Sequence, residues 1–264
     1  MDSENAQSVA NRRLLFILSN LAIFMIGLGF AVRTAIVGDL QGDLFNELDL
    51  ARSATMAAEV LGATFIGFAL TLLFGAALVD LIGMRRMLLF SALGYFFGSV
   101  MVVVASFMAP TVAAYWVVYF GLLLTGLGWG AVEAATNPLV AAAYPDEKTH
   151  RLNILHAWWP AGIVIGGLIG ILLAMMGMPW QVNLLVLMLP AIVLVLMVQR
   201  VTWGMVCNVH GFGNVTLAYD DDKQIQAHDG LGALPVHFSG WPAFAIGAAG
   251  DLGTGMPGFG RVTL

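Results

Sequence analysis

Six long stretches almost free of charged residues constrain this chain more than any other feature of its sequence. Each has about the 20 residues that an α-helix needs to cross the roughly 30 Å hydrocarbon core of a bilayer. The stretches are continuously apolar, which excludes the alternating strands of a membrane β-barrel. The sequence therefore predicts an all-α membrane protein, a six-helix bundle with helices at about 14–37, 57–80, 87–108, 112–137, 154–176 and 182–198.

The composition supports the same class. Of the 264 residues, 59% are hydrophobic and 10% are charged, whereas charged residues make up about 25% of an ordinary soluble domain. The 11 Lys and Arg residues form no basic cluster, so no nucleic-acid partner is expected. The single cysteine, Cys207, cannot form an intramolecular disulfide or by itself hold a metal. We expect neither a metal site nor a cofactor.

Basic residues gather in alternate connections between the six stretches, namely at Arg12, Arg13, Arg85, Arg86, Lys148, Arg151 and Arg200. Under the positive-inside rule, such connections remain on the cytoplasmic side of the membrane. We therefore predict a multi-pass protein of the cell membrane whose N-terminus is cytoplasmic.

The connection after the second stretch combines a carboxylate, a glycine and two arginines: Asp80, Gly83, Arg85 and Arg86. These groups can pair locally and interact with neighbouring helix ends, which would make the turn a conformational element. Its spacing is equally compatible with a polar turn at the membrane surface. Spacing alone leaves both interpretations open.

The fourth stretch carries one acid, Glu133, in the segment from Gly126 to the Asn137-Pro138 pair, where we expect the helix to end. An acid among so many apolar residues is a functional-site hypothesis by default, and alternate glycines allow a neighbouring helix to approach closely. The alternative is that Glu133 lies near the cytoplasmic interface and is solvated there.

Two further polar residues allow competing interpretations. Arg33 lies far into the first stretch, where it either extends to the outer headgroups or contacts an anion in a central cavity. His156, early in the fifth stretch, can act as a proton relay, although a packing role is favoured.

The turn at 75–86 resembles the signature loop of the major facilitator superfamily, although Ala76 and Leu81 depart from the usual pattern. The segment 126–156 resembles the fucose:galactose:proton symporter group within that superfamily. This resemblance implies that Glu133 is a protonatable acid of the substrate cavity, next to the Asn137-Pro138 pair, and that Asn153 is a polar cavity residue.

One departure bears on the substrate. The sugar symporters of this group have an aspartate in the first helix, whereas the comparable region here offers Arg33 and Thr34. An anionic substrate is then plausible. The resemblance also implies inverted three-helix repeats, which place Arg33 and Glu133 toward opposite membrane faces, so no direct ion pair between them is expected.

The resulting hypothesis is half of a secondary transporter that moves a small polar solute, a sugar or an organic anion, together with protons. It is not expected to be an enzyme; an intramembrane enzyme or a membrane scaffold without transport activity is the alternative. The substrate site of such transporters lies between two six-helix halves. A second six-helix half is therefore an expected partner, besides the bilayer, the solute and protons.

The character of the chain changes at residues 201–264, which are rich in glycine and contain no stretch long enough to span a membrane. We expect an irregular, disordered tail. Two accounts stay open: a half-size protein that pairs with itself or with a partner, or a truncated or frameshifted product that is inactive alone. The second is favoured because the family-like pattern stops after Arg200.

Overall fold

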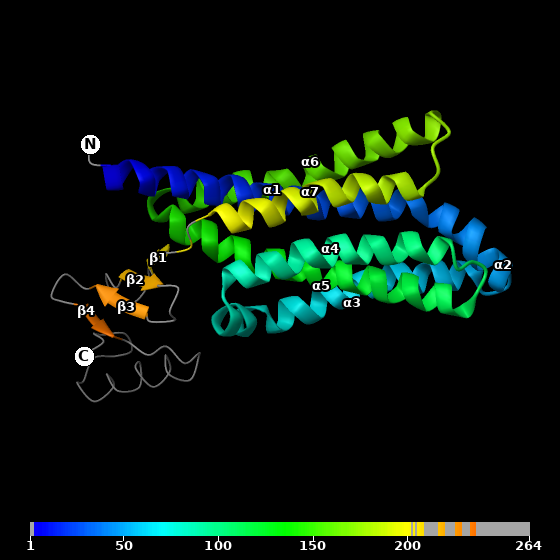
Figure 1. The fold of residues 1–264 in the computed structure, drawn as a ribbon, viewed down its shortest axis with the longest axis horizontal. Coiled ribbons are helices and arrows are strands. Elements are labelled where there is room, and N and C mark those ends of the chain that lie inside the picture. Colours follow the sequence, from blue (N-terminus) through cyan, green and yellow to red (C-terminus); the bar gives the residue numbers. More distant parts are fainter. Residues whose placement is uncertain are drawn as a thin grey trace.

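A computed structural model describes residues 3–201, 203, 205–208, 216–219, 225–228 and 233–235, with the side chains of residues 11–201 except 76 and 80, and of residue 203. In this described part, six helices are long and apolar enough to cross a membrane. They run side by side along the long axis of the molecule (Figure 1). This arrangement confirms the predicted six-helix membrane bundle.

The bundle consists of six long helices joined by short connections. The long helices are α1 (Ser3–Leu40), α3 (Ser53–Ile82), α4 (Met84–Ser106), α5 (Val112–Ala143), α6 (Lys148–Met175) and α7 (Gln181–Arg200). After α1 the chain forms a π-helical turn, η1 (Gln41–Phe45), and a single turn, α2 (Asn46–Leu48). A 3-10 turn, η2 (Pro145–Glu147), joins α5 to α6.

The fourth membrane helix does not end at Asn137-Pro138, so the expected boundary was wrong: α5 continues to Ala143. Proline removes one backbone donor, which costs the helix a single hydrogen bond. The Asn137 side chain donates to the carbonyl oxygen of Glu133 at 3.1 Å. Beyond the proline, Leu139 and Val140 are buried. Their burial favours continued helix and offsets the missing bond.

The fifth membrane helix starts earlier than the apolar pattern indicates, at Lys148 rather than near residue 154. Its first turn is polar, and Arg151 forms an ion pair with Glu147 across one helical turn at 2.8 Å. Such pairs stabilise a solvated helix end. Hydropathy finds the part of a helix inside the bilayer, and here the helix extends beyond it.

Two helix pairs pack through backbone contacts at glycines. A Cβ atom on Gly27 of α1 would collide with the backbone of Trp159 of α6, beside Gly162. A Cβ atom on Gly126 of α5 would collide in the same way with the backbone of Thr64 of α3. Small residues let two helices approach this closely.

The two glycine contacts continue along the helices in the same register. Every fourth residue is small on both sides: Gly27, Ala31 and Ala35 lie against Gly162, Gly166 and Gly170, while Gly126, Gly130 and Ala134 lie against Gly67, Thr71 and Gly75. The membrane helices form a first group of three (α1, α3, α4) and a last group of three (α5, α6, α7). The first helix of each group therefore packs on the second helix of the other group in the same way, α1 on α6 and α5 on α3. This is the internal symmetry expected of inverted repeats.

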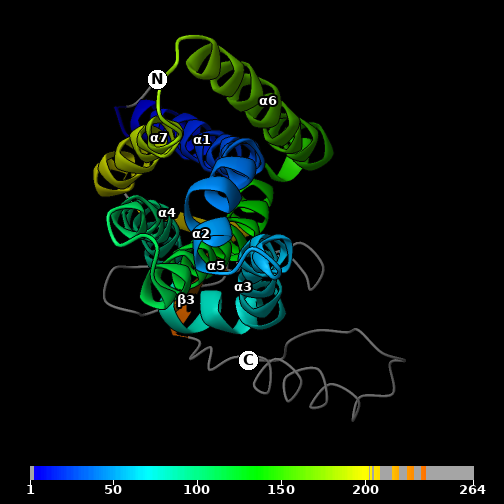
Figure 2. The same cartoon turned by 90° about the vertical axis from the view of Figure 1, so that its right-hand side faces the viewer.

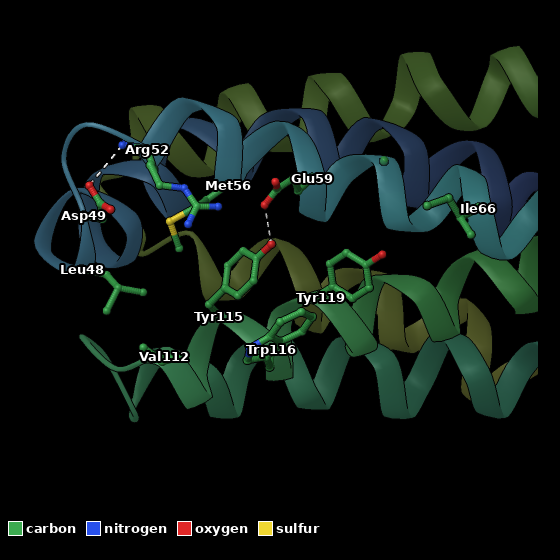
Figure 3. Close-up of a pocket in the computed structure, with 11 residues that line it drawn as sticks. Leu48, Asp49, Arg52, Met56, Glu59, Ile66, Val112, Tyr115, Trp116 and Tyr119 are labelled. Atoms are coloured by element: carbon green, nitrogen blue, oxygen red, sulfur yellow. Dashed lines mark hydrogen bonds between the residues drawn. The ribbon is translucent and has the colours of Figure 1, made fainter.

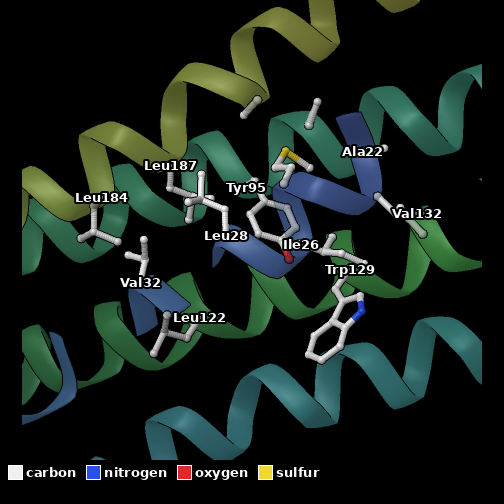
Figure 4. Packing of buried hydrophobic residues seen from close by; sticks show 14 of the residues in the cluster. Ala22, Ile26, Leu28, Val32, Tyr95, Leu122, Trp129, Val132, Leu184 and Leu187 are labelled. Carbon is white, nitrogen blue, oxygen red and sulfur yellow. The ribbon is translucent and has the colours of Figure 1, made fainter. Parts of the chain in front are cut away.

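The core lies between α1, α4, α5 and α7, where Leu28, Tyr95 and Leu187 lie close together (Figure 4). Viewed along the helices, α6 lies at the outside of the bundle, against α1 (Figure 2). Its buried positions are Leu155 and the contact glycines Gly162, Gly166 and Gly170. Most of the apolar surface of α6 is therefore open to lipid or to another protein.

Four short strands are described in the tail: β1 (Met205–Asn208), β2 (Thr216–Tyr219), β3 (Ile225–His228) and β4 (Ala233–Pro235). They pair antiparallel in chain order, with Met205 opposite Tyr219 in the first pair. The sequence did not predict these strands. The remainder of the tail, and with it the expectation of disorder, lies outside the described residues.

Candidate functional site

A buried cation lies in the middle of the bundle. Arg33 of α1 is only 4% exposed. Among the described residues, neither terminal nitrogen of its guanidinium has a hydrogen-bond partner. The guanidinium is thus held inside the bundle, which does not fit the alternative that Arg33 extends to the headgroups. An unpaired charge in the membrane is costly and is expected to serve a function.

Two aromatic side chains surround this cation. The guanidinium carbon of Arg33 lies 5.8 Å from the ring centroid of Trp129 on α5, close enough for a cation–π interaction. The second aromatic side chain is Tyr95 of α4. Gly29 leaves room for its ring, because an added Cβ would lie 2.7 Å from the Tyr95 ring and 3.2 Å from Nη1 of Arg33. The residues Arg33, Tyr95 and Trp129 form what we term the central polar cluster.

One aromatic member of the central polar cluster also has an unused hydrogen-bonding group. The indole nitrogen of Trp129 is buried and has no hydrogen-bond partner among the described residues, while the buried Tyr95 hydroxyl lies close enough to interact with the Arg33 guanidinium. Figure 4 shows the Tyr95 oxygen directed to the side on which Trp129 lies. Buried polar groups are normally satisfied, so unused hydrogen-bonding capacity at Arg33 and Trp129 indicates a site prepared for a polar ligand or water.

Glu133 lies one helical turn beyond Trp129 on α5 and is half-buried. Its Oε2 atom accepts a long hydrogen bond, 3.4 Å, from Nδ2 of Asn137. The described residues contain no ion pair between Glu133 and Arg33, because their one ion pair joins Arg151 to Glu147.

Two other predicted site residues lie away from the central polar cluster. Asn153 and His156 on α6 are exposed on this bundle, whereas the α6 face toward α1 carries the contact glycines. The structure thus brings Arg33, Glu133 and Asn137 into the region of α1 and α5 but leaves the α6 residues on an open surface.

The predicted conformational turn joins α3 to α4 within one residue. Gly83 has φ +82° and ψ 153°, a conformation that side chains with Cβ rarely adopt. Its backbone N–H donates to the carbonyl of Val79. Arg85 and Arg86 are exposed, and the Asp80 side chain lies outside the described residues.

A pocket of about 670 Å³ opens between the end of η1–α2, the start of α3 and the start of α5. We term it the acidic pocket. Figure 3 shows Tyr115 of α5 facing Glu59 of α3 across it. The Tyr115 hydroxyl donates to Oε2 of Glu59 at 2.6 Å. Its lining residues are Leu48, Asp49, Arg52, Met56, Glu59, Gly62, Ile66, Val112, Tyr115, Trp116 and Tyr119.

Nothing in the sequence singles out Glu59, because an acid at the edge of an apolar stretch is normal for an interfacial helix end. The signal that was present is the aromatic group at Tyr115, Trp116 and Tyr119, which repeats with helical spacing at the start of the fourth stretch. Only the pairing of α3 with α5 shows that these rings face Glu59.

The chain matches the model of a known protein family. A family model described as the Major Facilitator Superfamily matches residues 14–206. A search of curated proteins found no match. Within the described residues, no group of three or more His, Cys, Asp or Glu side chains is placed to hold a metal ion.

Proposed function

The chain belongs to the major facilitator superfamily, and from this premise we propose that it moves a small organic anion across the cell membrane together with protons. As a member, it is a multi-pass membrane protein and a secondary transporter of the major facilitator type. The identity of the solute, the coupling to protons and a cytoplasmic N-terminus are parts of the proposal.

The observation that carries the proposal is Arg33, a buried cation without a counter-ion among the described residues. A carboxylate or phosphate on the solute would accept hydrogen bonds from both free nitrogens, and charge-assisted bonds of this kind are the strongest that side chains make. The Trp129 ring, 5.8 Å from the guanidinium, favours the same cation. An anion fits this environment better than a neutral sugar does.

Glu133 supports the coupling to protons. It lies on α5 one turn from Trp129, and its carboxylate accepts a long hydrogen bond from Asn137. A solute anion arriving near Arg33 would repel a charged Glu133 and favour its protonation. Proton and anion would then bind together, which is the requirement for symport. The resemblance to sugar:proton symporters assigns the same role to Glu133.

The exposed polar groups of α6 support a second six-helix half. Asn153 and His156 are exposed on α6, whose later turns are apolar, and polar side chains facing lipid are costly. A second bundle, from a partner or a second copy, would cover them and close the solute cavity. We expect the single bundle to bind solute weakly and not to transport it alone.

Thermal unfolding of the purified full chain in detergent can test the anion assignment. Carboxylates, phosphate esters and neutral sugars would be compared at equal concentration, since a ligand that binds only the folded state raises the unfolding temperature. We expect at least one anion to stabilise the wild type and to have no effect on Arg33→Gln. Stabilisation by sugars alone, equal in both proteins, would contradict the proposal.

A further inference from the structure

A second pocket, of about 390 Å³, opens at the opposite end of the bundle from the acidic pocket. Its lining residues come from the start of α1, the end of α5 and the start of α6. These helix ends lie at the same end of the bundle as the turn between α3 and α4 (Figure 1). We term this second pocket the basic pocket. It is lined by Arg12, Arg13, Phe16, Ile17, Tyr144 and Arg151.

One wall of the basic pocket is fixed by aromatic contacts. The guanidinium of Arg151 lies 4.5 Å from the ring centroid of Tyr144 and 5.2 Å from that of Phe16. Glu147 holds the same guanidinium through bonds of 2.8 Å. The Tyr144 hydroxyl donates to the carbonyl oxygen of Arg12 at 3.2 Å, which joins this wall to α1. The pocket is thus formed before any ligand arrives.

The opposite wall carries two free cations. Arg12 and Arg13 are exposed, and neither forms an ion pair with a carboxylate among the described residues. Since Glu147 already neutralises Arg151, the pocket retains the charge of two arginines. Guanidinium groups bind phosphate oxygens through parallel hydrogen bonds.

A comparison of the two repeats shows that the helix packing explains the shape of the basic pocket but not its charge. Counted from Gly27 on α1 and Gly126 on α5, Phe16 corresponds to Tyr115 and Ile17 to Trp116. The packing scheme therefore produces a pocket at each end. At the position of Arg13, however, the acidic pocket has Val112. Arg13 at the start of α1 therefore has no basic counterpart at the start of α5, so its charge is not a by-product of the packing.

The neighbouring apolar residue indicates where the ligand comes from. Ile17 lines the pocket one turn deeper than Arg13, within the predicted membrane span, and is 55% exposed. The pocket is therefore charged at its rim and apolar toward the bilayer. We propose that the basic pocket binds a phosphate group, supplied by the headgroup of an anionic phospholipid whose acyl chain lies along Ile17. This site does not depend on the identity of the transported solute.

Native mass spectrometry of the full chain, with phosphatidylglycerol, phosphatidylcholine or inorganic phosphate added, can test this site. We expect one phosphatidylglycerol to bind more tightly than phosphatidylcholine, and Arg12→Gln/Arg13→Gln to weaken its binding about thirtyfold, since each arginine at an anionic membrane surface contributes about fivefold in affinity. The control Arg85→Gln/Arg86→Gln removes the same charge from the same end of the bundle and should leave binding unchanged.

Two further results decide the source and the mechanism. Arg12→Lys/Arg13→Lys keeps the charge but not the planar fork, so partial retention of binding supports a phosphate contact and also shows that the variant folds. Displacement of the lipid by millimolar inorganic phosphate would assign the pocket to soluble phosphate esters instead. Equal losses in the Arg12/Arg13 and Arg85/Arg86 variants would overturn the site, because general surface charge would then explain binding.

Discussion

The two three-helix repeats share a backbone packing scheme but place their charges differently. Arg33 and Thr34 of α1 correspond to Val132 and Glu133 of α5 when counted from the contact glycines Gly27 and Gly126. At the first position both side chains are buried, Arg33 at 4% and Val132 at 0% exposure. At the second, Thr34 is exposed and Glu133 is half-buried.

This difference separates residues that the packing requires from residues that it does not require. A buried position that accepts valine in one repeat needs no charge for packing, so the arginine in the other repeat is a cost to stability. The acid, in contrast, occupies a position that is not fully buried in either repeat, where a charge can be partly hydrated. The two charges therefore differ in their environments as well as in sign.

The largest expected effect concerns the shared glycines. Gly27→Ala and Gly126→Ala should each lower the free energy of unfolding by about 3 kcal/mol, because the new Cβ meets backbone that cannot rotate away. Unfolding by titration with sodium dodecyl sulfate measures the loss. Gly38→Ala, in open space on α1, is the control and should be neutral or stabilising by up to about 1 kcal/mol. A large loss of stability at only one of the two contact glycines would show that the two repeats do not pack in the same way.

The next effect comes from exchanging the residues at the buried pair of positions, Arg33 and Val132. Arg33→Val should raise the free energy of unfolding by about 3 kcal/mol, since it replaces an unpaired membrane charge with the residue of the other repeat. The mirror change, Val132→Arg, should lower it by a similar amount. The same titration measures both. A loss of stability in Arg33→Val would mean that Arg33 has a structural partner and would remove it as the solute contact.

A smaller effect, on anion binding, is expected at the partly exposed pair of positions, Thr34 and Glu133. Binding of the solute anion should depend on pH in the wild type, because the proposal has the anion and a proton bind together. Glu133→Gln should bind the anion with no such dependence, because it is neutral throughout. Binding curves at several pH values, with Thr34→Val as the control in the other repeat, measure this. An unchanged pH dependence in Glu133→Gln would exclude Glu133 from coupling.

The smallest effect lies in the acidic pocket. Tyr115→Phe installs the residue found at the corresponding position of α1, Phe16, and removes the 2.6 Å bond to Glu59. We expect a loss of about 1.5 kcal/mol, the usual value for a hydrogen bond to a charged group. Tyr119→Phe, in the same pocket, serves as the control in the same titration. Equal losses of unfolding free energy in Tyr115→Phe and Tyr119→Phe would show that the bond to Glu59 adds no stability of its own.

Much of the fold could be predicted because each membrane span is a local property. A stretch of about 20 apolar residues enters the bilayer as a helix whatever its neighbours are. The alternate glycines around Gly126 also indicate, from the sequence alone, that another helix approaches closely there. The end of α5 could not be predicted, because Pro138 opposes the helix locally and only burial of Leu139 and Val140 offsets it.

The membrane class, the six spans and the presence of one charge in each of the first and fourth spans follow from the order of the residues alone. Which of these charges is enclosed depends on the tertiary structure. Arg33 and Glu133 look alike along the chain, since each is a lone charge in an apolar stretch, but α4 and α5 close around the first and leave the second half-open. Tyr115 and Glu59 likewise become partners only when α3 packs against α5. Hydropathy acts residue by residue, whereas burial and pairing depend on which helix faces lie against one another.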